Sequence, residues 1–214
     1  MFYLMKQVIL RDQVVSLQNK QGLLLHPMNG LDEMRHKYIS CLDLNKIARS
    51  GSVVVLDVGF GVGYLSSLFL DSLWKINPQC KVVIVGVEND SEVLESIQTA
   101  VMPLKSFGIL KSVLRGEKYP FLEITLIKGD VRTVNVDRND VDVVFYDLYP
   151  PTAEREVWDA QIFLKLGLCM KLSGVLVTHS GDNLVRQSLF EVGFVWDEVR
   201  PSGRFGVGTI ARKS

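Results

Sequence analysis

The chain alternates short, continuously apolar segments with longer amphipathic ones, and this alternation limits the folds open to it. The apolar segments read as buried strands and occupy residues 53–58, 81–89, 121–130, 141–151 and 174–180. The amphipathic segments read as helices and occupy residues 63–76, 153–172 and 183–192, with a further helix from Ser91. Strands that are apolar throughout and alternate with helices predict an α/β fold, a doubly wound Rossmann-like sheet that is mostly parallel and covered on both faces.

The two ends of the chain have different patterns. Residues 1–28 predict an N-terminal extension of short strands, at residues 6–12, 14–20 and 22–26. Residues 29–214 then form one domain, which opens with a turn and a helix capped by Asn29 and ended by Gly51. At the other end, residues 193–213 predict an antiparallel hairpin closed by a Pro/Ser/Gly turn.

The bulk composition excludes several classes of protein. No apolar run approaches the roughly 20 residues that span a bilayer, and the first residues lack the features of a signal peptide, so we expect a cytoplasmic protein. Its cysteines, Cys41, Cys80 and Cys169, are expected to be reduced thiols, because they are odd in number and far apart. Because 24 basic residues balance 24 acidic ones, only a local basic face is available for nucleic acid.

A glycine-rich segment, DVGFGVG at residues 57–63, follows the strand at 53–58 and opens a helix. Glycine lets the backbone approach a ligand closely. A nicotinamide site has the spacing G-x-G-x-x-G, but Tyr64 occupies the sixth position here. The observed spacing, Gly59, Gly61 and Gly63 with Asp57 before them, resembles motif I of the class I S-adenosylmethionine-dependent methyltransferases. That resemblance implies S-adenosyl-L-methionine as the cofactor, with Asp57 helping to hold its ammonium group.

Acids also end the next two strands. Glu88 closes the strand at 81–89, where a carboxylate can accept hydrogen bonds from both hydroxyls of a ribose. Asp130 closes the strand at 121–130, where the resemblance implies a contact with the adenine amino group. Because ligands of open α/β sheets bind outside the carboxyl ends of the strands, these acids and the glycine turn predict one cofactor crevice.

The strand at 141–151 carries the residues that we expect to act on a substrate. Asp147 ends its apolar part, and Tyr149 follows before the rigid pair Pro150 and Pro151. Asp147, beside the cofactor, is placed to hold an amine and accept its surplus proton, and Tyr149 to stack on a planar substrate. These two residues are the candidate catalytic groups. Neither His26, His36 nor His179 has partners at metal-ligand spacing, so we expect no metal and interpret His179 as structural.

Several motifs together resemble one family, the stand-alone relatives of the methyltransferase half of the tRNA 5-methylaminomethyl-2-thiouridine biosynthesis protein MnmC. The resemblance covers residues 16–212 and is carried by NGLDEMRHKYI, VLDVGFGVGYLSSLF, VDVVFYDLYPPTAEREVW, LSGVLVTHSGDNLVRQSLFEVGF and GRFGVG. It implies methylation of the exocyclic amine of 5-aminomethyl(-2-thio)uridine at the tRNA wobble position. It also implies a catalytic role for Asp147, base stacking for Tyr149, and a place over the cofactor for Asn29, Gly30 and Glu33, with Glu33 closing the site.

The chain departs from the family pattern after the aspartate. Leu148 stands where the family has Gly, and residues 152–155 replace its Lys-Asn-Pro, with Arg155 as a substitute cation. The acceptor therefore stays open between tRNA and a small-molecule amine, and an aminopropyltransferase or a non-catalytic S-adenosylmethionine-binding subunit is also compatible with the residues. Contact with tRNA phosphates would use two basic stretches, Lys105, Lys111, Arg115 and Lys118, and Arg200, Arg204, Arg212 and Lys213.

Overall fold

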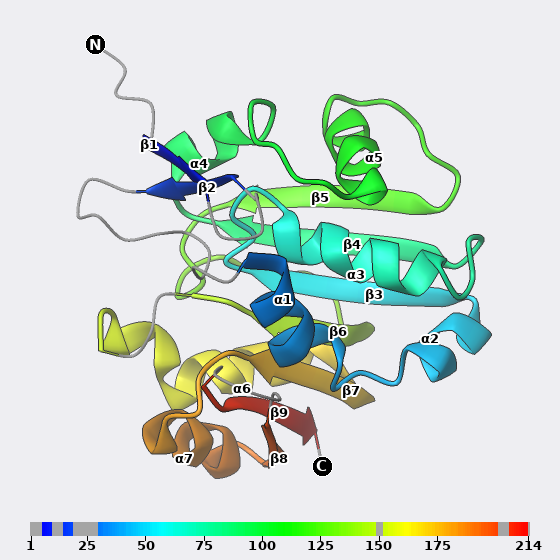
Figure 1. Cartoon of the computed structure of the whole chain (residues 1–214). Coiled ribbons are helices and arrows are strands. Elements are labelled where there is room, and N and C mark those ends of the chain that lie inside the picture. The colour runs from blue at the N-terminus through cyan, green and yellow to red at the C-terminus, as the bar shows by residue number, and fades with distance from the viewer. Residues whose placement is uncertain (1–5, 10–14, 19–29, 149–151, 201–205, 214) are drawn as a thin grey trace.

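The computed structural model describes residues 6–9, 15–18, 30–148, 152–200 and 206–213. A seven-stranded sheet runs through its middle in the order β5-β4-β3-β6-β7-β9-β8 (Figure 1). Its strands are β3 (Ser52–Val58), β4 (Lys81–Glu88), β5 (Leu122–Lys128), β6 (Val141–Tyr146), β7 (Met170–Thr178), β8 (Phe194–Val199) and β9 (Gly208–Lys213). The pairings from β5 to β7 are parallel, while β9 is antiparallel to β7 and to β8, as the sequence predicts.

The strand order reverses between β3 and β6. From β3 the chain continues outward through β4 to β5, then returns to the other side of β3 to form β6 and β7. The connections after β3 and after β6 therefore leave the sheet in opposite directions. Such a switch point opens a crevice at the carboxyl ends of the strands, and this is where an open α/β sheet binds its ligand.

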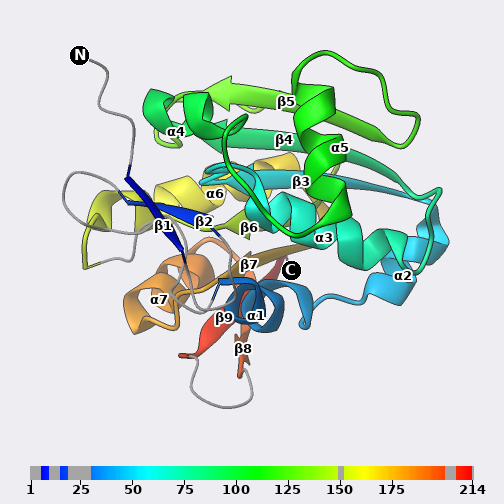
Figure 2. The ribbon, with the colours of Figure 1, turned by 45° about the horizontal axis from the view of Figure 1, so that its top comes forward.

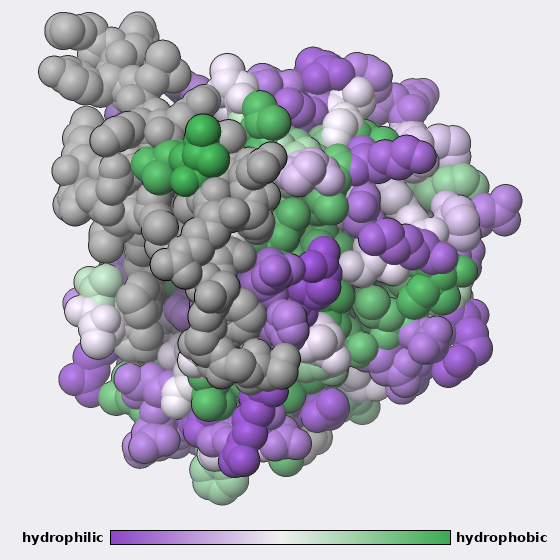
Figure 3. All heavy atoms as spheres, viewed as in Figure 1, coloured by the Kyte–Doolittle hydropathy of each residue, from purple (hydrophilic) through white to green (hydrophobic). Residues whose placement is uncertain are grey.

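Helices cover both faces of the sheet (Figures 1 and 2). The helical segments are α1 (Gly30–Met34), the π-helix η1 (Arg35–Ile39), α2 (Leu44–Ser50), α3 (Tyr64–Trp74), α4 (Ser91–Ser96), α5 (Lys105–Leu114), the 3-10 helix η2 (Arg155–Trp158), α6 (Ala160–Cys169) and α7 (Asn183–Glu191). One buried cluster lies under α1, η1, α3 and α5, and a second lies under α6 and α7. Figure 3 shows apolar residues reaching this face of the molecule in small patches, with hydrophilic residues around them.

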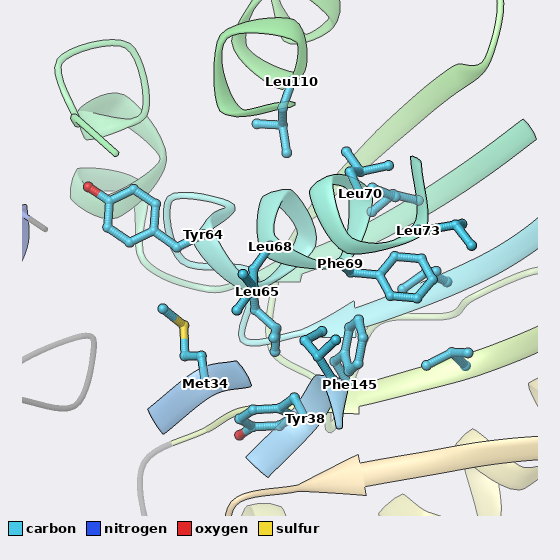
Figure 4. Close-up of a cluster of buried hydrophobic side chains, with 14 of the residues drawn as sticks. Met34, Tyr38, Tyr64, Leu65, Leu68, Phe69, Leu70, Leu73, Leu110 and Phe145 are labelled. Atoms are coloured by element: carbon cyan, nitrogen blue, oxygen red, sulfur yellow. The ribbon is translucent and has the colours of Figure 1, made fainter. Parts of the chain in front are cut away.

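The first of these clusters holds the segment from α1 to η1 against the sheet (Figure 4). Met34 and Tyr38 point toward Leu65 and Phe145, and all of them are buried. The Tyr38 ring meets the Phe145 ring edge-on, with 6.0 Å between ring centroids. This packing fixes Tyr38 beside the end of β6, so its hydroxyl has a defined position at the crevice edge of the sheet.

Two helices that the sequence predicts as continuous are interrupted. The expected helix over residues 29–51 divides into α1 with η1 and then α2, because Asp43 caps α2 by accepting a hydrogen bond from the Lys46 amide at 2.9 Å. The expected helix over residues 153–172 divides at Asp159, which caps α6, and its last residues belong to β7. Gly51 does end α2, with a positive φ of 75°.

At the N-terminus, β1 (Lys6–Ile9) and β2 (Val15–Gln18) pair antiparallel as a separate two-stranded sheet. The predicted strand at 22–26, the Asn29 cap and the turn at 201–205 lie outside the described residues. The boundary between an extension and a domain at residue 29 stays a prediction. In the described part of the chain, none of the helices has the length and apolar character needed to cross a bilayer.

Candidate functional site

The glycine turn after β3 adopts a conformation that favours glycine at every second residue. Gly59, Gly61 and Gly63 have φ values of 83°, 57° and 85°, in the left-handed region that side chains disfavour. The amides of Gly59 and Phe60 both donate to the Val87 carbonyl oxygen, each at 3.0 Å. The turn is therefore fastened to the carboxyl end of β4, the neighbouring strand.

The turn also lies directly against the end of β6. A Cβ atom on Gly59 would collide with the carbonyl oxygen of Asp147, which is backbone and cannot move aside easily. On the other flank, the Phe60 ring occupies the space that a side chain at Gly86 would need. A Cβ atom on Gly86 would lie 2.5 Å from Cδ2 of Phe60. Gly59 in the turn and Gly86 in β4 thus allow the turn, β4 and the Asp147 segment to meet at one point.

Glu88, the last residue of β4, joins this turn through its carboxylate. Its Oε2 accepts a hydrogen bond from the Gly61 amide at 2.8 Å, and its Oε1 accepts one from the Asp90 amide at 2.9 Å. Burial raises the pKa of the Glu88 carboxyl, although these amides oppose that shift. The predicted site residues Glu88 and Gly61 are therefore in direct contact.

Asp57 lies under the turn, near the end of β3, and is fully buried. The Ser66 hydroxyl donates to its Oδ2 at 2.5 Å, whereas its Oδ1 has no hydrogen-bond partner among the residues that the structure describes. Burial, together with the charges of Asp147 and Glu88, raises the pKa of Asp57 to about 8, although the Ser66 hydrogen bond opposes that shift. A buried acceptor without a partner is costly, so this oxygen is suited to a cationic ligand group.

Asp130 stands two residues beyond β5 and lines a cleft of about 290 Å³ together with Gly59, Glu88 and Glu154. Arg132 binds both oxygens of the Asp130 carboxylate, with Nε at 2.9 Å and 3.0 Å, and holds the pKa of Asp130 below its usual range. The same guanidinium is 3.8 Å from Glu154. Asp130 is at the predicted place, but a ligand that bonds to it would share it with Arg132.

Asp147 follows β6 directly, and its amide donates to the Val58 carbonyl oxygen at 2.9 Å. The Tyr38 hydroxyl donates to Asp147 Oδ1 at 2.5 Å, and His179 Nδ1 is 3.2 Å from the same oxygen. Tyr38 and His179 also touch each other, with 3.2 Å between the Tyr38 hydroxyl and Nδ1. The structure therefore surrounds the predicted catalytic carboxylate with two polar side chains.

Sequence reasoning missed Tyr38 and interpreted His179 as structural. Tyr38 occurs at helical spacing among core residues and carries no sequence signal of a polar role. His179 does carry one, because it directly follows β7 at the same edge of the sheet as Glu88 and Asp147. A place at the carboxyl end of a central strand indicates a site residue for the acids, and it does so equally for a histidine.

The remaining predicted site residues are at the start of α1 or outside the described ranges. Gly30 is buried with a φ of 51°, and Glu33 forms a largely buried ion pair with Lys37 at 2.9 Å. Asn29 and Tyr149 lie outside the described residues. Among the residues that are described, no group of three or more His, Cys, Asp and Glu side chains could hold a metal ion.

The described members of the first basic stretch have different partners. Lys111 donates to the carbonyl oxygens of Gln98 and Ala100, and Arg115 forms an ion pair with Glu117 at 2.8 Å. Lys118 lies just before Tyr119, which pairs with Leu122, the first residue of β5. It is therefore at the amino end of that strand, away from the glycine turn at the carboxyl ends.

In the second stretch, Arg200 directly follows β8, whose last residue pairs with Gly208. Gly208 precedes Thr209, the partner of Thr178, so Arg200 lies at the same sheet edge as His179. Arg212 pairs with Val195 and Val175, farther from that edge. Arg204 is outside the described residues. Within the described part of the chain, Arg200 and Lys118 thus lie at opposite ends of the strands, and the contact of the two stretches with tRNA stays a prediction.

Comparison with known proteins gives consistent results. A family model described as S-adenosyl-L-methionine-dependent methyltransferase matches residues 100–214. The chain is 28% identical over 204 residues to the tRNA 5-methylaminomethyl-2-thiouridine biosynthesis bifunctional protein MnmC of Leptospira interrogans, and 25% identical over 190 residues to that of Leptospira borgpetersenii. These alignments cover 83% and 80% of this chain. They cover 30% and 29% of the relatives, so the chain spans less than a third of their length.

Solved structures agree with the fold. MnmC2 from Aquifex aeolicus is similar with a TM-score of 0.85 and 25% identity, over 97% of this chain and 70% of that one. A TehB-like S-adenosylmethionine-dependent methyltransferase from Corynebacterium glutamicum is similar with a TM-score of 0.50 and 13% identity, over 86% of this chain and 88% of that one. The second likeness shows the fold alone.

Proposed function

Since the chain belongs to the S-adenosyl-L-methionine-dependent methyltransferase family, we propose that it methylates the exocyclic amine of 5-aminomethyl(-2-thio)uridine at the wobble position of tRNA. The observation that carries this proposal is the carboxylate of Asp147, held directly beside the glycine turn by Tyr38 and His179. The names of the similar proteins support it, because the MnmC relatives are called tRNA 5-methylaminomethyl-2-thiouridine biosynthesis proteins.

The residues at the crevice fit the cofactor. Oδ1 of Asp57, which has no partner in the described part of the chain, suits the ammonium group, and Glu88 at the end of β4 suits the ribose hydroxyls. Asp130 suits the adenine amino group, and Gly59, Gly61 and Gly63 let the backbone approach the ligand closely. When bound, S-adenosyl-L-methionine supplies an electrophilic methyl group on a sulfonium. Gly30 and Glu33 belong to the same proposal as residues that lie over the cofactor, as does Asn29.

Asp147 acts on the acceptor. An amine is a nucleophile only when its lone pair is free, so the ammonium form of the substrate must first lose a proton. That first proton goes to water, so Asp147 is still a carboxylate at the transfer step: it accepts an N–H hydrogen bond from the neutral amine, points the lone pair, and takes the surplus proton from the nitrogen after the methyl group has been transferred. As the nitrogen gains the methyl group it also gains positive charge, and the fixed anion of Asp147 stabilises that charge. Tyr149 is proposed to stack on the uracil ring that carries the amine.

A tRNA substrate would need a surface of the protein that binds phosphates, and it would be met in the cytoplasm. Phosphate contacts position a nucleic acid, and Arg200 lies at the crevice edge of the sheet. The free thiols of Cys41, Cys80 and Cys169 are consistent with the reducing cytoplasm, where we place the protein in this proposal. A small-molecule amine is the competing acceptor, and the following experiment separates the two.

The test uses labelled S-adenosyl-L-methionine and tRNA that lacks only the final methyl group, digested afterwards to nucleosides. We expect label on the exocyclic amine of the wobble nucleoside. Asp147→Asn keeps the shape but not the charge, so turnover should fall about 10²–10⁴-fold while S-adenosylhomocysteine still binds. The exposed Asp137→Asn is the matched control and should retain wild-type turnover.

Two results would contradict this proposal. Label that enters a free aminomethyl nucleoside as efficiently as the tRNA would identify a small-molecule enzyme. Wild-type turnover in Asp147→Asn would show that Asp147 is only a carboxylate at the end of a strand.

A further inference from the structure

Three side chains from distant parts of the sequence meet at the end of β6. Tyr38 comes from η1, Asp147 follows β6, and His179 follows β7. The Tyr38 hydroxyl is 2.5 Å from Asp147 Oδ1 and 3.2 Å from His179 Nδ1, and Nδ1 is 3.2 Å from Oδ1. The His179 backbone amide also donates to the Tyr38 oxygen, at 3.2 Å. The three polar atoms thus form a closed triangle.

The number of protons in this triangle determines which atoms donate. A carboxylate oxygen only accepts, and Tyr38 has one hydroxyl proton, which goes to Asp147 over the shortest of the three distances. If Nδ1 of His179 carried a lone pair, that lone pair would face a carboxylate oxygen at 3.2 Å, which is repulsive. We therefore assign a proton to Nδ1, which lies 3.2 Å both from the Tyr38 oxygen, its hydrogen-bond partner, and from Asp147 Oδ1. Oδ1 then faces two donors, the Tyr38 hydroxyl and the Nδ1–H group.

The surroundings keep the donors in place. The Tyr38 ring is buried, and its edge-on contact with Phe145 holds it in the core. The imidazole of His179 lies edge-on to the buried ring of Trp158, with 5.8 Å between centroids. Burial and the adjacent Asp147 raise the pKa of Tyr38 well above its usual value, so the hydroxyl keeps its proton at neutral pH.

The other acids nearby make these donors necessary. Asp57 on β3 and Glu88 on β4 are buried close to the same crevice, and the charges of Asp147 and Glu88 both act on Asp57. Like charges at such a site oppose one another, so the ionised state goes to the carboxylate with the best donors. The Tyr38 hydrogen bond and the adjacent Nδ1–H group at Oδ1 favour the ionised form of Asp147, while Asp57, bonded by the Ser66 hydroxyl, takes the neutral form.

We propose that Tyr38 and His179 are positioning residues for methyl transfer, which hold Asp147 ionised and in one orientation by donating hydrogen bonds to its Oδ1. The inference rests on the proposed function, because it assigns Asp147 the task of receiving an amine. Neither residue touches the acceptor in this account. Each acts through the carboxylate, whose orientation sets the direction in which the amine is held.

The first test is Tyr38→Phe, which keeps the ring in the core and removes the donor. We expect kcat to fall about 10- to 100-fold, the change that corresponds to a lost hydrogen bond to a charged group, with unchanged affinity for S-adenosylhomocysteine. The acid limb of the pH–rate profile should also move to higher pH, because the ionised carboxylate has lost a donor.

Tyr64→Phe is the matched control. Tyr64 is a buried tyrosine of the same cluster, and its hydroxyl donates to the Val101 carbonyl oxygen at 2.9 Å, on the other side of α3 from Tyr38 (Figure 4). Its loss should lower thermal stability about as much as Tyr38→Phe does, without the change in kcat or in the pH profile. Equal effects of the two variants on kcat would overturn the role of Tyr38.

His179 is tested with two variants. The side-chain amide of Asn places an N–H donor where Nδ1 stands, so His179→Asn should retain most of the activity, while His179→Ala should lose it about as Tyr38→Phe does. If Asn and Ala reduce kcat equally, His179 is not needed as a donor and the inference is wrong for it.

A measurement without substrate separates this inference from the proposed function. Two-bond ¹⁵N–¹H correlations of the full chain identify which ring nitrogen of His179 carries a proton. A proton on Nδ1, together with a Tyr38 hydroxyl signal that disappears in Tyr38→Phe, supports the triangle whatever the acceptor is. A bare Nδ1 refutes it. If tRNA is not methylated but Nδ1 is protonated, the proposed acceptor is wrong and the arrangement at Asp147 stands.

Discussion

Single residues around the glycine turn carry different charges because their surroundings differ. Asp57 is fully buried with one oxygen unpartnered among the described residues, and its pKa is raised to about 8. Asp130 is bound by the Arg132 guanidinium, which lowers the pKa of its carboxyl. At neutral pH the acid under the turn is therefore mostly protonated, while the acid at the end of the cleft is ionised.

This difference predicts that ligand binding releases a proton. At pH 7 most of the ligand-free protein has Asp57 protonated. A ligand ammonium beside Oδ1 favours the carboxylate, so binding lowers the pKa of Asp57. Affinity should therefore rise as pH increases from about 6 toward 7.5, a range in which the ammonium of the ligand keeps its proton. Calorimetry with S-adenosylhomocysteine in buffers of different ionisation enthalpy measures the released proton.

Asp57→Asn is the control for that experiment, because it keeps the shape and cannot titrate. The variant should bind S-adenosylhomocysteine more weakly than the wild type does. Its binding enthalpy should be the same in every buffer. A wild-type binding enthalpy that does not depend on the buffer would contradict the assignment of the ammonium to Asp57.

Among the elements, the interruption before α6 shows how a helix cap helps to position His179. Asp159 Oδ1 accepts a hydrogen bond from the Gln161 amide at 2.8 Å, and this begins α6 two residues after Trp158. Trp158 is then free of the helix that follows, and its buried ring packs against Tyr146 and His179. The cap therefore supports the position of the ring that holds His179.

Asp159→Ala should destabilise the protein by about 0.5–2 kcal/mol, the usual cost of a lost helix N-cap. Chemical denaturation measures this free energy of unfolding. Asp159→Asn retains an oxygen acceptor and should remain close to the wild type. If Ala and Asn are equally destabilising, the charge of Asp159 matters and the cap hydrogen bond does not.

For the whole molecule, the sheet separates the basic residues into two ends. Arg200 lies at the crevice edge, and Lys118 lies at the edge where β5 begins. Both are exposed, and each contributes one positive charge to a chain with a formal net charge of +0. A nucleic acid that reaches Asp147 would pass Arg200 before it could meet Lys118. Substitutions at these two positions should therefore differ in their effect on tRNA binding.

We expect Arg200→Ala to weaken tRNA binding and to reduce the slope of log affinity against log salt by about 1, the effect of losing one phosphate contact. Lys118→Ala removes the same charge at the other edge and should leave both quantities unchanged. Filter binding over a range of salt concentrations measures them. Equal effects of the two variants would indicate a general electrostatic attraction and would argue against a defined tRNA path along β8.

The sequence alone determined the class of fold and most of the crevice. Continuous apolar runs must be buried on both faces, so they predicted β3, β4, β5, β6 and β7, and the chain order placed Asp57, Glu88, Asp130 and Asp147 at strand ends. The glycine spacing predicted the turn, because only glycine adopts those backbone angles readily. These features are local or periodic, so they can be predicted from the order of the residues alone.

The tertiary structure decided which of these residues touch and what else joins them. Tyr38 is 109 residues from Asp147 in the chain, and its spacing in the helix is that of a core residue, so no local pattern distinguishes its hydroxyl. The binding of Asp130 by the Arg132 guanidinium depends on side-chain packing, as does the lack of a partner for Asp57 Oδ1 among the described residues. A sequence pattern specifies which face is buried, whereas hydrogen-bond partners follow from how buried faces fit together in space.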